Sequence, residues 1–74
     1  MDASIYFDEP HYSWVVKIWN GVETQADSVL TDLIDKHRSE FSHAITISID
    51  ECDAFAWCFN KKDATKLLKY VRKN

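Results

Sequence analysis

Residues 44–74 read AITISID, ECD, AFAWCF and NKKDATKLLKYVRKN in succession. Apolar and polar side chains alternate in residues 44–50, and small and aromatic side chains alternate in residues 54–59. A repeat at every second position is the period of a β-strand. The short acidic segment between them interrupts this alternation and is typical of a tight turn. From about Lys61 onward, apolar residues recur with helical spacing. The stretch therefore predicts a strand, a turn, a second strand and a helix.

The preceding residues predict two further strands and another helix. Residues 3–8 and 12–19 alternate in the same way as the later strands. Beyond them, apolar residues with helical spacing predict a helix from about Gln25 to about Phe41. The strand at residues 12–19 is fairly apolar on both faces, which suits a central strand or one whose outer face meets a partner.

The predicted order β-β-α-β-β-α indicates an α+β fold built as a two-layer sandwich. Both helices are expected on one face of a four-stranded antiparallel sheet. The last five elements match five of the six in a ferredoxin-like arrangement, and residues 3–8 are expected to supply the missing strand. The sheet order would then be one, two, four, three. A chain of 74 residues is expected to form a single domain, 1–74.

The last predicted strand alternates large aromatic residues with small ones. The aromatic set is Phe55, Trp57 and Phe59. The small set is Ala54, Ala56 and Cys58. Since the aromatic side chains would bury far more apolar area, we expect them in the core and the small residues on the open face of the sheet.

The segment Asp53–Phe59 resembles the RNP1 pattern of RNA-recognition motifs, and Asp63-Ala64 resembles the start of the helix that follows it in that family. The resemblance covers about a dozen residues. It implies aromatic side chains on the open sheet face, where they stack on bases, and buried residues at the alternate positions. Asp53 and Ala54 depart from the pattern, because the family has a basic residue and a glycine there. We therefore favour the core assignment for the aromatic residues.

The open face of the predicted sheet is the candidate partner-binding surface. It is expected to carry Tyr6, Val15, Lys17 and Trp19. Large side chains of this kind anchor protein interfaces. The sequence thus favours a small non-enzymatic protein that binds another protein as a modulator or inhibitor. A homodimer through stacked sheets is the other interaction that this face would allow. Small inhibitors from phages and other mobile elements are one such group.

Charge is divided unevenly along the chain. Residues 60–74 hold six basic side chains and one acidic one, whereas residues 1–59 hold three basic and eleven acidic ones. The basic helix either balances the acidic helix beside it or contacts phosphates or an acidic partner. The alternative function is therefore a nucleic-acid-associated protein that uses Lys62, Lys66, Lys69, Arg72 and Lys73. A net charge of −3 disfavours nonspecific nucleic-acid affinity.

Catalytic residues, a metal site and a cofactor are not expected. The three histidines stand apart in the sequence, at His11, His37 and His43. The spacing of Cys52 and Cys58 matches no usual zinc-ligand pair, and the acidic turn at 50–53 lacks the glycine of a calcium loop. No apolar run approaches the roughly 20 residues of a membrane span, and the N-terminus does not read as a signal peptide. A cytoplasmic protein is expected.

Overall fold

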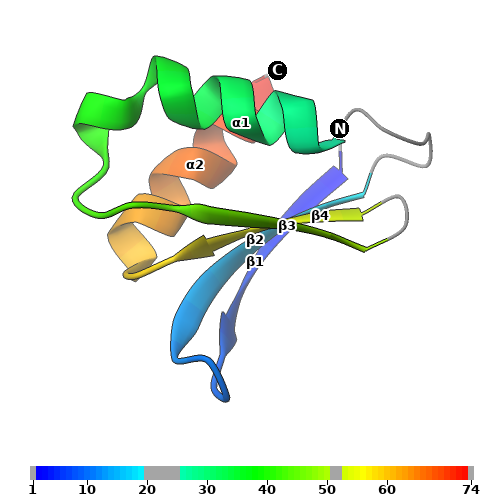
Figure 1. The fold of residues 1–74 in the computed structure, drawn as a ribbon, viewed down its shortest axis with the longest axis vertical. Helices are drawn as coiled ribbons and strands as arrows, with labels where there is room; N and C mark the ends of the chain where they lie inside the picture. Colours follow the sequence, from blue (N-terminus) through cyan, green and yellow to red (C-terminus); the bar gives the residue numbers. More distant parts are fainter. Residues whose placement is uncertain (1, 20–25, 51–52, 74) are drawn as a thin grey trace.

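The computed structural model describes residues 2–19, 26–50 and 53–73, and these form an α+β fold (Figure 1). Its elements are β1 (Asp2–Asp8), β2 (Ser13–Trp19), α1 (Ala26–Lys36), the short 3₁₀ helix η1 (Arg38–Glu40), β3 (Thr46–Asp50), β4 (Asp53–Cys58) and α2 (Lys61–Lys73). The predicted order of strands and helices is confirmed. The expected helix start at Gln25 lies outside the described residues.

All neighbouring strands of the sheet are antiparallel, in the order β1-β2-β4-β3. This is the order predicted from the sequence. Both helices lie on one face of the sheet (Figure 1). α1 packs on β3 and β4, and α2 packs on β1, β2 and β4. The opposite face has no helix over it among the described residues, and we call it the open face.

The first helix ends earlier than predicted. The His37 N–H still donates to the Leu33 carbonyl at 3.1 Å, but the next turn tightens into η1. There the Phe41 N–H donates to the Arg38 carbonyl at 3.2 Å, and Phe41 itself has extended backbone angles. Ending the helix here lets Phe41 pack against the edge of the core instead of pointing along the helix.

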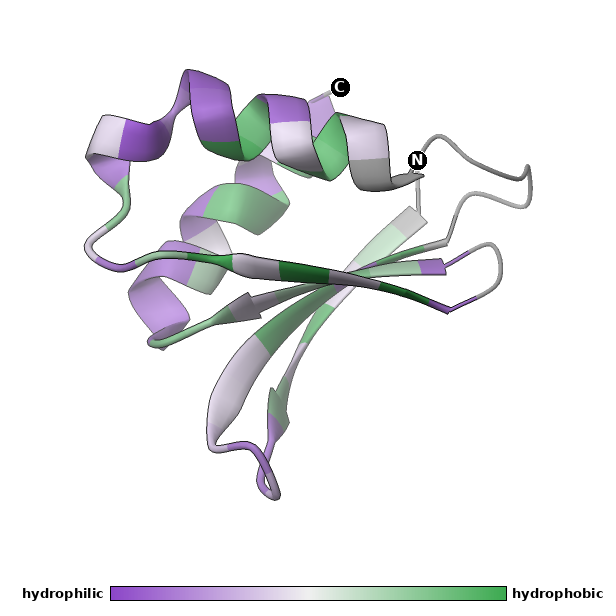
Figure 2. Cartoon of the chain, in the orientation of Figure 1, coloured by the Kyte–Doolittle hydropathy of each residue, from purple (hydrophilic) through white to green (hydrophobic). Residues whose placement is uncertain are grey.

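The core lies between the helices and the sheet. Apolar residues recur along every strand, and both helices combine apolar and polar positions (Figure 2). The fully buried members include Val16 and Ile18 from β2, Leu30 from α1, and Leu67 and Val71 from α2. The register sets Val16 directly between Ile5 and Ala56, and Ala56 directly between Val16 and Ile47.

The expected facing of β4 is wrong. Ala54, Ala56 and Cys58 point into the core and are at most 1% exposed, whereas Phe55 and Trp57 are half-buried on the open face. Phe59, just beyond the strand, is 68% exposed.

The physical reason for this facing is space above the central strand. β4 lies beneath both helices, and their large side chains, such as Leu30 and Leu67, already fill the gap between the layers. Small residues on β4 let those side chains interdigitate at native packing density. Phe55 and Trp57 in the same place would overpack the core.

A buried carboxylate ties the loop before β3 to the start of α2. Asp63 is 1% exposed and accepts hydrogen bonds from the Ser42 N–H at 3.1 Å, the Ser42 hydroxyl at 2.9 Å and the His43 N–H at 3.3 Å. Asn60 caps the helix, because its side-chain oxygen accepts from the Asp63 N–H at 2.8 Å. Its amide nitrogen also donates to the Ser42 hydroxyl at 3.0 Å.

Candidate interaction face

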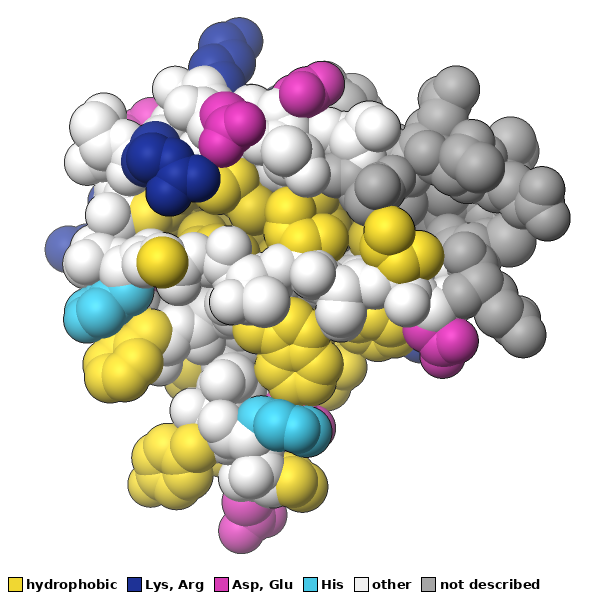
Figure 3. All heavy atoms as spheres, viewed as in Figure 1, with side chains coloured by type: hydrophobic (Ala, Val, Ile, Leu, Met, Phe, Trp, Pro, Cys, Tyr) yellow, Lys and Arg dark blue, Asp and Glu magenta, His cyan; other side chains and the backbone are white. Residues whose placement is uncertain are grey.

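The open face carries a compact layer of large side chains across the two central strands and β1. We call Tyr6, Val15, Lys17, Phe55 and Trp57 the open-face layer. The strand register sets Val15 directly between Tyr6 and Trp57, and sets Lys17 directly opposite Phe55. On the side of the sheet away from the helices, hydrophobic side chains reach the surface (Figure 3).

Val15 shows how closely this layer is packed. It is 0% exposed although it lies on the face without helices. Its neighbours across the strands, Tyr6 and Trp57, stand on either side of it. Tyr6 remains 38% exposed, and burial, followed by the nearby Asp8 carboxylate, raises its pKa above the ordinary value for tyrosine. The layer is thus an apolar floor with partly exposed aromatic rings around it.

Polar contacts hold Trp57 in place. The indole N–H donates to the Ser48 hydroxyl at 2.8 Å. The His11 ring meets the Trp57 ring edge to face, with 5.0 Å between the centroids. The Nδ1 atom of His11 in turn lies 2.5 Å from the Asp8 carboxylate, and this contact holds the imidazole against the Trp57 ring on the open face. Such fixed aromatic rings lose little conformational entropy when a partner covers them.

Lys17 links the apolar and acidic parts of the face. Its ammonium group lies 5.4 Å from the centre of the Phe55 ring and 3.6 Å from the Asp53 carboxylate. Asp8, Asp50 and Asp53 all belong to the strand ends around this layer. The apolar centre is therefore bordered by acidic groups, with Lys17 as a cation inside that border.

The structure brings together three of the four residues expected to bind a partner. Tyr6, Val15 and Lys17 belong to the open-face layer, and the side chain of Trp19 lies outside the described part of the chain. Val15 is too deeply buried to touch a partner, so it supports its neighbours instead.

Sequence reasoning missed Phe55 and Trp57 as residues of the open face. The signal that could have found them is the segment resembling RNP1, since that pattern puts its aromatic residues on the open face and buries the residues between them.

The basic residues of α2 lie elsewhere, on the helix surface. Lys62, Lys69, Arg72 and Lys73 are exposed. Lys66 donates to the Glu40 carbonyl at 2.9 Å, so it contacts the end of the acidic segment. Among the side chains that the structure describes, no ion pair joins a basic residue of α2 to Asp32 or Asp35 of α1. The described contact of a basic residue of α2 with the acidic segment is therefore the one between Lys66 and Glu40 of η1.

The histidines and the described cysteine have separate surroundings. His43 stacks on Phe59 at 4.3 Å between centroids, and its Nδ1 lies 2.9 Å from the Ser42 hydroxyl. Burial, followed by the nearby Asp63 carboxylate, raises the pKa of the Cys58 thiol to about 12, so this thiol is a poor nucleophile. Cys52 lies outside the described residues. Within the described part of the chain, no three metal-ligating side chains come together.

Comparisons with known proteins find no relative of this chain. No protein-family model, curated protein or solved structure matches it significantly. Among the described residues, neither helix is long and apolar enough to cross a membrane.

Proposed function

We propose that this protein acts by binding another protein through the open face of its sheet, as a modulator or inhibitor without catalytic activity of its own. The observation that carries the proposal is the open-face layer. Val15 is completely buried there by aromatic neighbours that remain partly exposed themselves. A packed apolar surface of this kind on an uncovered sheet face is characteristic of an interaction site.

The residue types in the layer support protein recognition. Tyrosine and tryptophan are enriched among the residues that contribute most to binding free energy, because each buries a large apolar area and keeps a polar group for hydrogen bonding. Here the Tyr6 side chain remains partly exposed, and contacts with Ser48 and His11 already orient the Trp57 ring. The acidic groups around the layer favour a partner whose own apolar patch has basic residues at its border.

A matched pair of tyrosine variants tests this proposal. Tyr6→Ser removes an aromatic ring from the layer, whereas Tyr12→Ser removes one that is 80% exposed in the β1–β2 turn and outside the layer. The partner is first sought by affinity capture with the wild-type protein and identified by mass spectrometry. Its affinity for each purified variant is then measured by calorimetry.

We expect Tyr6→Ser to weaken binding about tenfold, as loss of a central aromatic residue does. Tyr12→Ser should bind like the wild type. Thermal unfolding of each variant shows whether the fold is intact. Equal affinities for Tyr6→Ser and the wild type, with both folded, would count against the open face. Light scattering of the purified wild type shows whether the partner is a second copy of the chain.

Nucleic acid is the second candidate partner, and one observation favours it. Phe55 and Trp57 stand on the open face, as the resemblance to RNA-recognition motifs implies, and exposed cations line α2. Against it, Asp8, Asp50 and Asp53 would repel phosphates beside those rings.

Tryptophan fluorescence tests this alternative. Quenching by a single-stranded RNA at low salt would favour it if added salt reverses the quenching and the double variant Lys69→Glu/Arg72→Glu weakens it. The absence of quenching at low salt would remove it.

The same proposal includes three finer inferences. The sheet and helices follow a ferredoxin-like arrangement in which β1 takes the place of the final strand. The protein acts in the cytoplasm, where a free thiol such as the buried Cys58 stays reduced. Its small size and open face are suited to an inhibitor of the kind encoded by phages or other mobile elements.

A further inference from the structure

The sheet ends on one side at β3, and the outer edge of this strand is open. β3 pairs with β4, and among the described residues no strand pairs with its other side. In Figure 1, β3 is the strand nearest the viewer, and no helix or strand lies in front of it. Alternate residues of such an edge direct their backbone N–H and C=O groups away from the sheet, where another strand can pair with them.

The edge of β3 lacks the features that usually prevent strand pairing. Native proteins protect exposed edges with lysine, proline or a β-bulge. β3 reads Thr-Ile-Ser-Ile-Asp, with neither lysine nor proline, and its register with β4 continues without a bulge. Ile49 is 58% exposed on this strand, although it is a large apolar residue. The edge therefore combines an open backbone with an uncovered apolar side chain.

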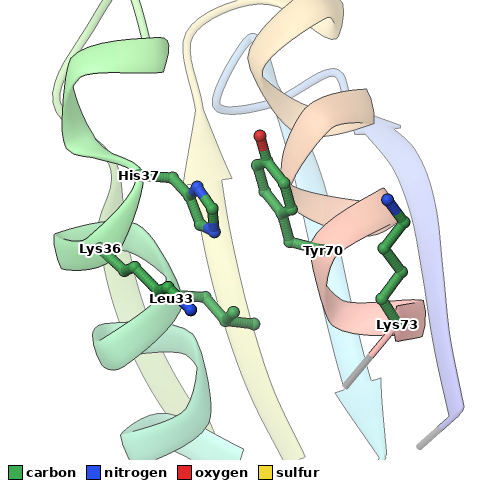
Figure 4. Close-up of a pocket in the computed structure, with 5 residues that line it drawn as sticks. All are labelled: Leu33, Lys36, His37, Tyr70 and Lys73. Carbon is green, nitrogen blue, oxygen red and sulfur yellow. The ribbon is translucent and has the colours of Figure 1, made fainter.

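The helix above β3 is fixed beside the other helix and leaves this edge open. α1 packs on β3, β4 and α2. His37, the residue after α1, stacks on Tyr70 of α2 with 3.7 Å between the ring centroids and 5° between the ring planes (Figure 4). The Glu40 carboxylate lies 2.7 Å from His37 Nδ1 and accepts a hydrogen bond from the Tyr70 hydroxyl. These contacts hold α1 over the sheet and not across its edge.

The sequence of this edge is nearly the same in both directions. Residues 45–49, which are the residue before β3 and its first four residues, read Ile-Thr-Ile-Ser-Ile. In an antiparallel pair of two copies, a two-fold axis at Ile47 sets each of these isoleucines opposite an isoleucine and Thr46 opposite Ser48. Apolar pairs bury area, and threonine–serine pairs form hydrogen bonds between neighbouring strands. Asp50 would lie opposite an alanine, so no like charges meet.

We propose that a second copy of this chain pairs antiparallel with the outer edge of β3, which joins the two sheets into one. The two-fold axis would be perpendicular to the sheet, so that the helices of both copies lie on one face and both open-face layers on the other. This interface is separate from the open face and does not rest on the function proposed above. Because the paired strands are short, we expect a weak dimer with a Kd of roughly 10 to 100 μM.

Sedimentation equilibrium of the full chain at concentrations up to about 1 mM tests the proposal. We expect the average mass to rise with concentration from that of the 8.7 kDa chain toward twice this value. Backbone amide hydrogen exchange, followed by NMR, should become slower in β3 at high concentration and stay unchanged in β1. A wild type that remains monomeric throughout, or protection that appears in β1 and not in β3, would overturn the proposal.

Two variants place the same charge on the two edge strands. Ile49→Lys introduces a lysine at an exposed position of β3, where it should oppose strand pairing and weaken dimerisation at least about tenfold. Phe7→Lys is the matched control, since it replaces a 40% exposed apolar residue of β1, the other edge strand, and should dimerise like the wild type. Thermal unfolding shows whether each variant is folded. Dimerisation that is unchanged in Ile49→Lys, or lost equally in Phe7→Lys, would mean that association does not use the edge of β3.

Tyr6→Ser separates this dimer from one formed by stacked open faces. The variant alters the open-face layer but leaves the edge of β3 intact, so it should dimerise like the wild type. Loss of dimerisation in Tyr6→Ser together with normal dimerisation in Ile49→Lys would assign the interface to the open face and overturn the edge proposal.

Discussion

Glu40 is the residue whose charge depends most clearly on its neighbours. The hydrogen bond from Tyr70, followed by that from His37, holds the pKa of the Glu40 carboxyl below its ordinary value. A carboxyl with a lowered pKa contributes stability above its unfolded pKa and loses that contribution as pH falls through the folded value. The stabilising effect of Glu40 should therefore be complete at neutral pH and disappear in acid.

Glu40→Gln tests this expectation. At pH 7 the variant should have a lower free energy of unfolding than the wild type, measured by urea unfolding. As pH falls through the lowered pKa of the folded Glu40 carboxyl, the two should converge, because the wild-type carboxyl becomes protonated as well. Glu9→Gln, in the exposed β1–β2 turn, is the control and should give a similar difference from the wild type at pH 7 and in acid. A Glu40→Gln difference that stays equally large across the whole acid range in which the protein remains folded would show that the interaction does not depend on charge.

Cys58 offers a second test with a single residue. With its pKa raised to about 12 by burial, the folded protein should hold far less reactive thiolate than an unfolded chain does. In a Cys52→Ser background, labelling of Cys58 by a disulfide reagent at pH 8 should be slowed on the order of a hundredfold or more relative to the same chain in urea. Comparable rates in the two states would mean that the thiol is accessible in the native fold.

At the level of elements, the start of α2 depends on the carboxylate of Asp63. Replacing the buried Asp63 with Ala leaves the N–H groups of Ser42 and His43 without their acceptor. We expect a loss of about 2–3 kcal/mol in the free energy of unfolding, as for buried hydrogen bonds to a charged group. Asp35→Ala is the control, because its salt bridge to Arg38 is exposed and should contribute less than about 1 kcal/mol. Equal losses in urea unfolding would show that the buried network adds little.

The elements also show where sequence patterns are informative. Alternation and helical spacing predicted the strands, the helices and the sheet order, because they depend only on local periodicity and on short connections. Periodicity does not say which side of a strand faces the core when both sides are apolar. On β4 the choice between Phe55 and Ala56 depends on how far Leu30 and Leu67 reach down from the helices, which is a property of the assembled layers. The prediction of the β4 facing from buried apolar area alone was therefore wrong.

Across the whole molecule, one side of the sheet is packed under the helices, and no helix covers the other side among the described residues. Tyr6 and Lys17 could be predicted on the open face from alternation on β1 and β2. Trp57 and Phe55 could not, since their place follows from the error on β4. The stacking of His37 on Tyr70 was equally unpredictable, because the two rings meet only after the first helix ends and both helices are in place.

The unequal roles of the two sides of the sheet lead to a final prediction. Leu67→Ala opens a cavity in the core beneath α2 and should cost about 3 kcal/mol of the free energy of unfolding, a large fraction for so small a domain. Phe55→Thr removes a half-buried ring from the open face but keeps a residue that favours a strand, so it should cost about 1 kcal/mol. Urea unfolding monitored by circular dichroism measures both. If Phe55→Thr cost as much as Leu67→Ala, the open-face layer would be a second core that maintains the fold, and its value as a binding surface would be correspondingly smaller.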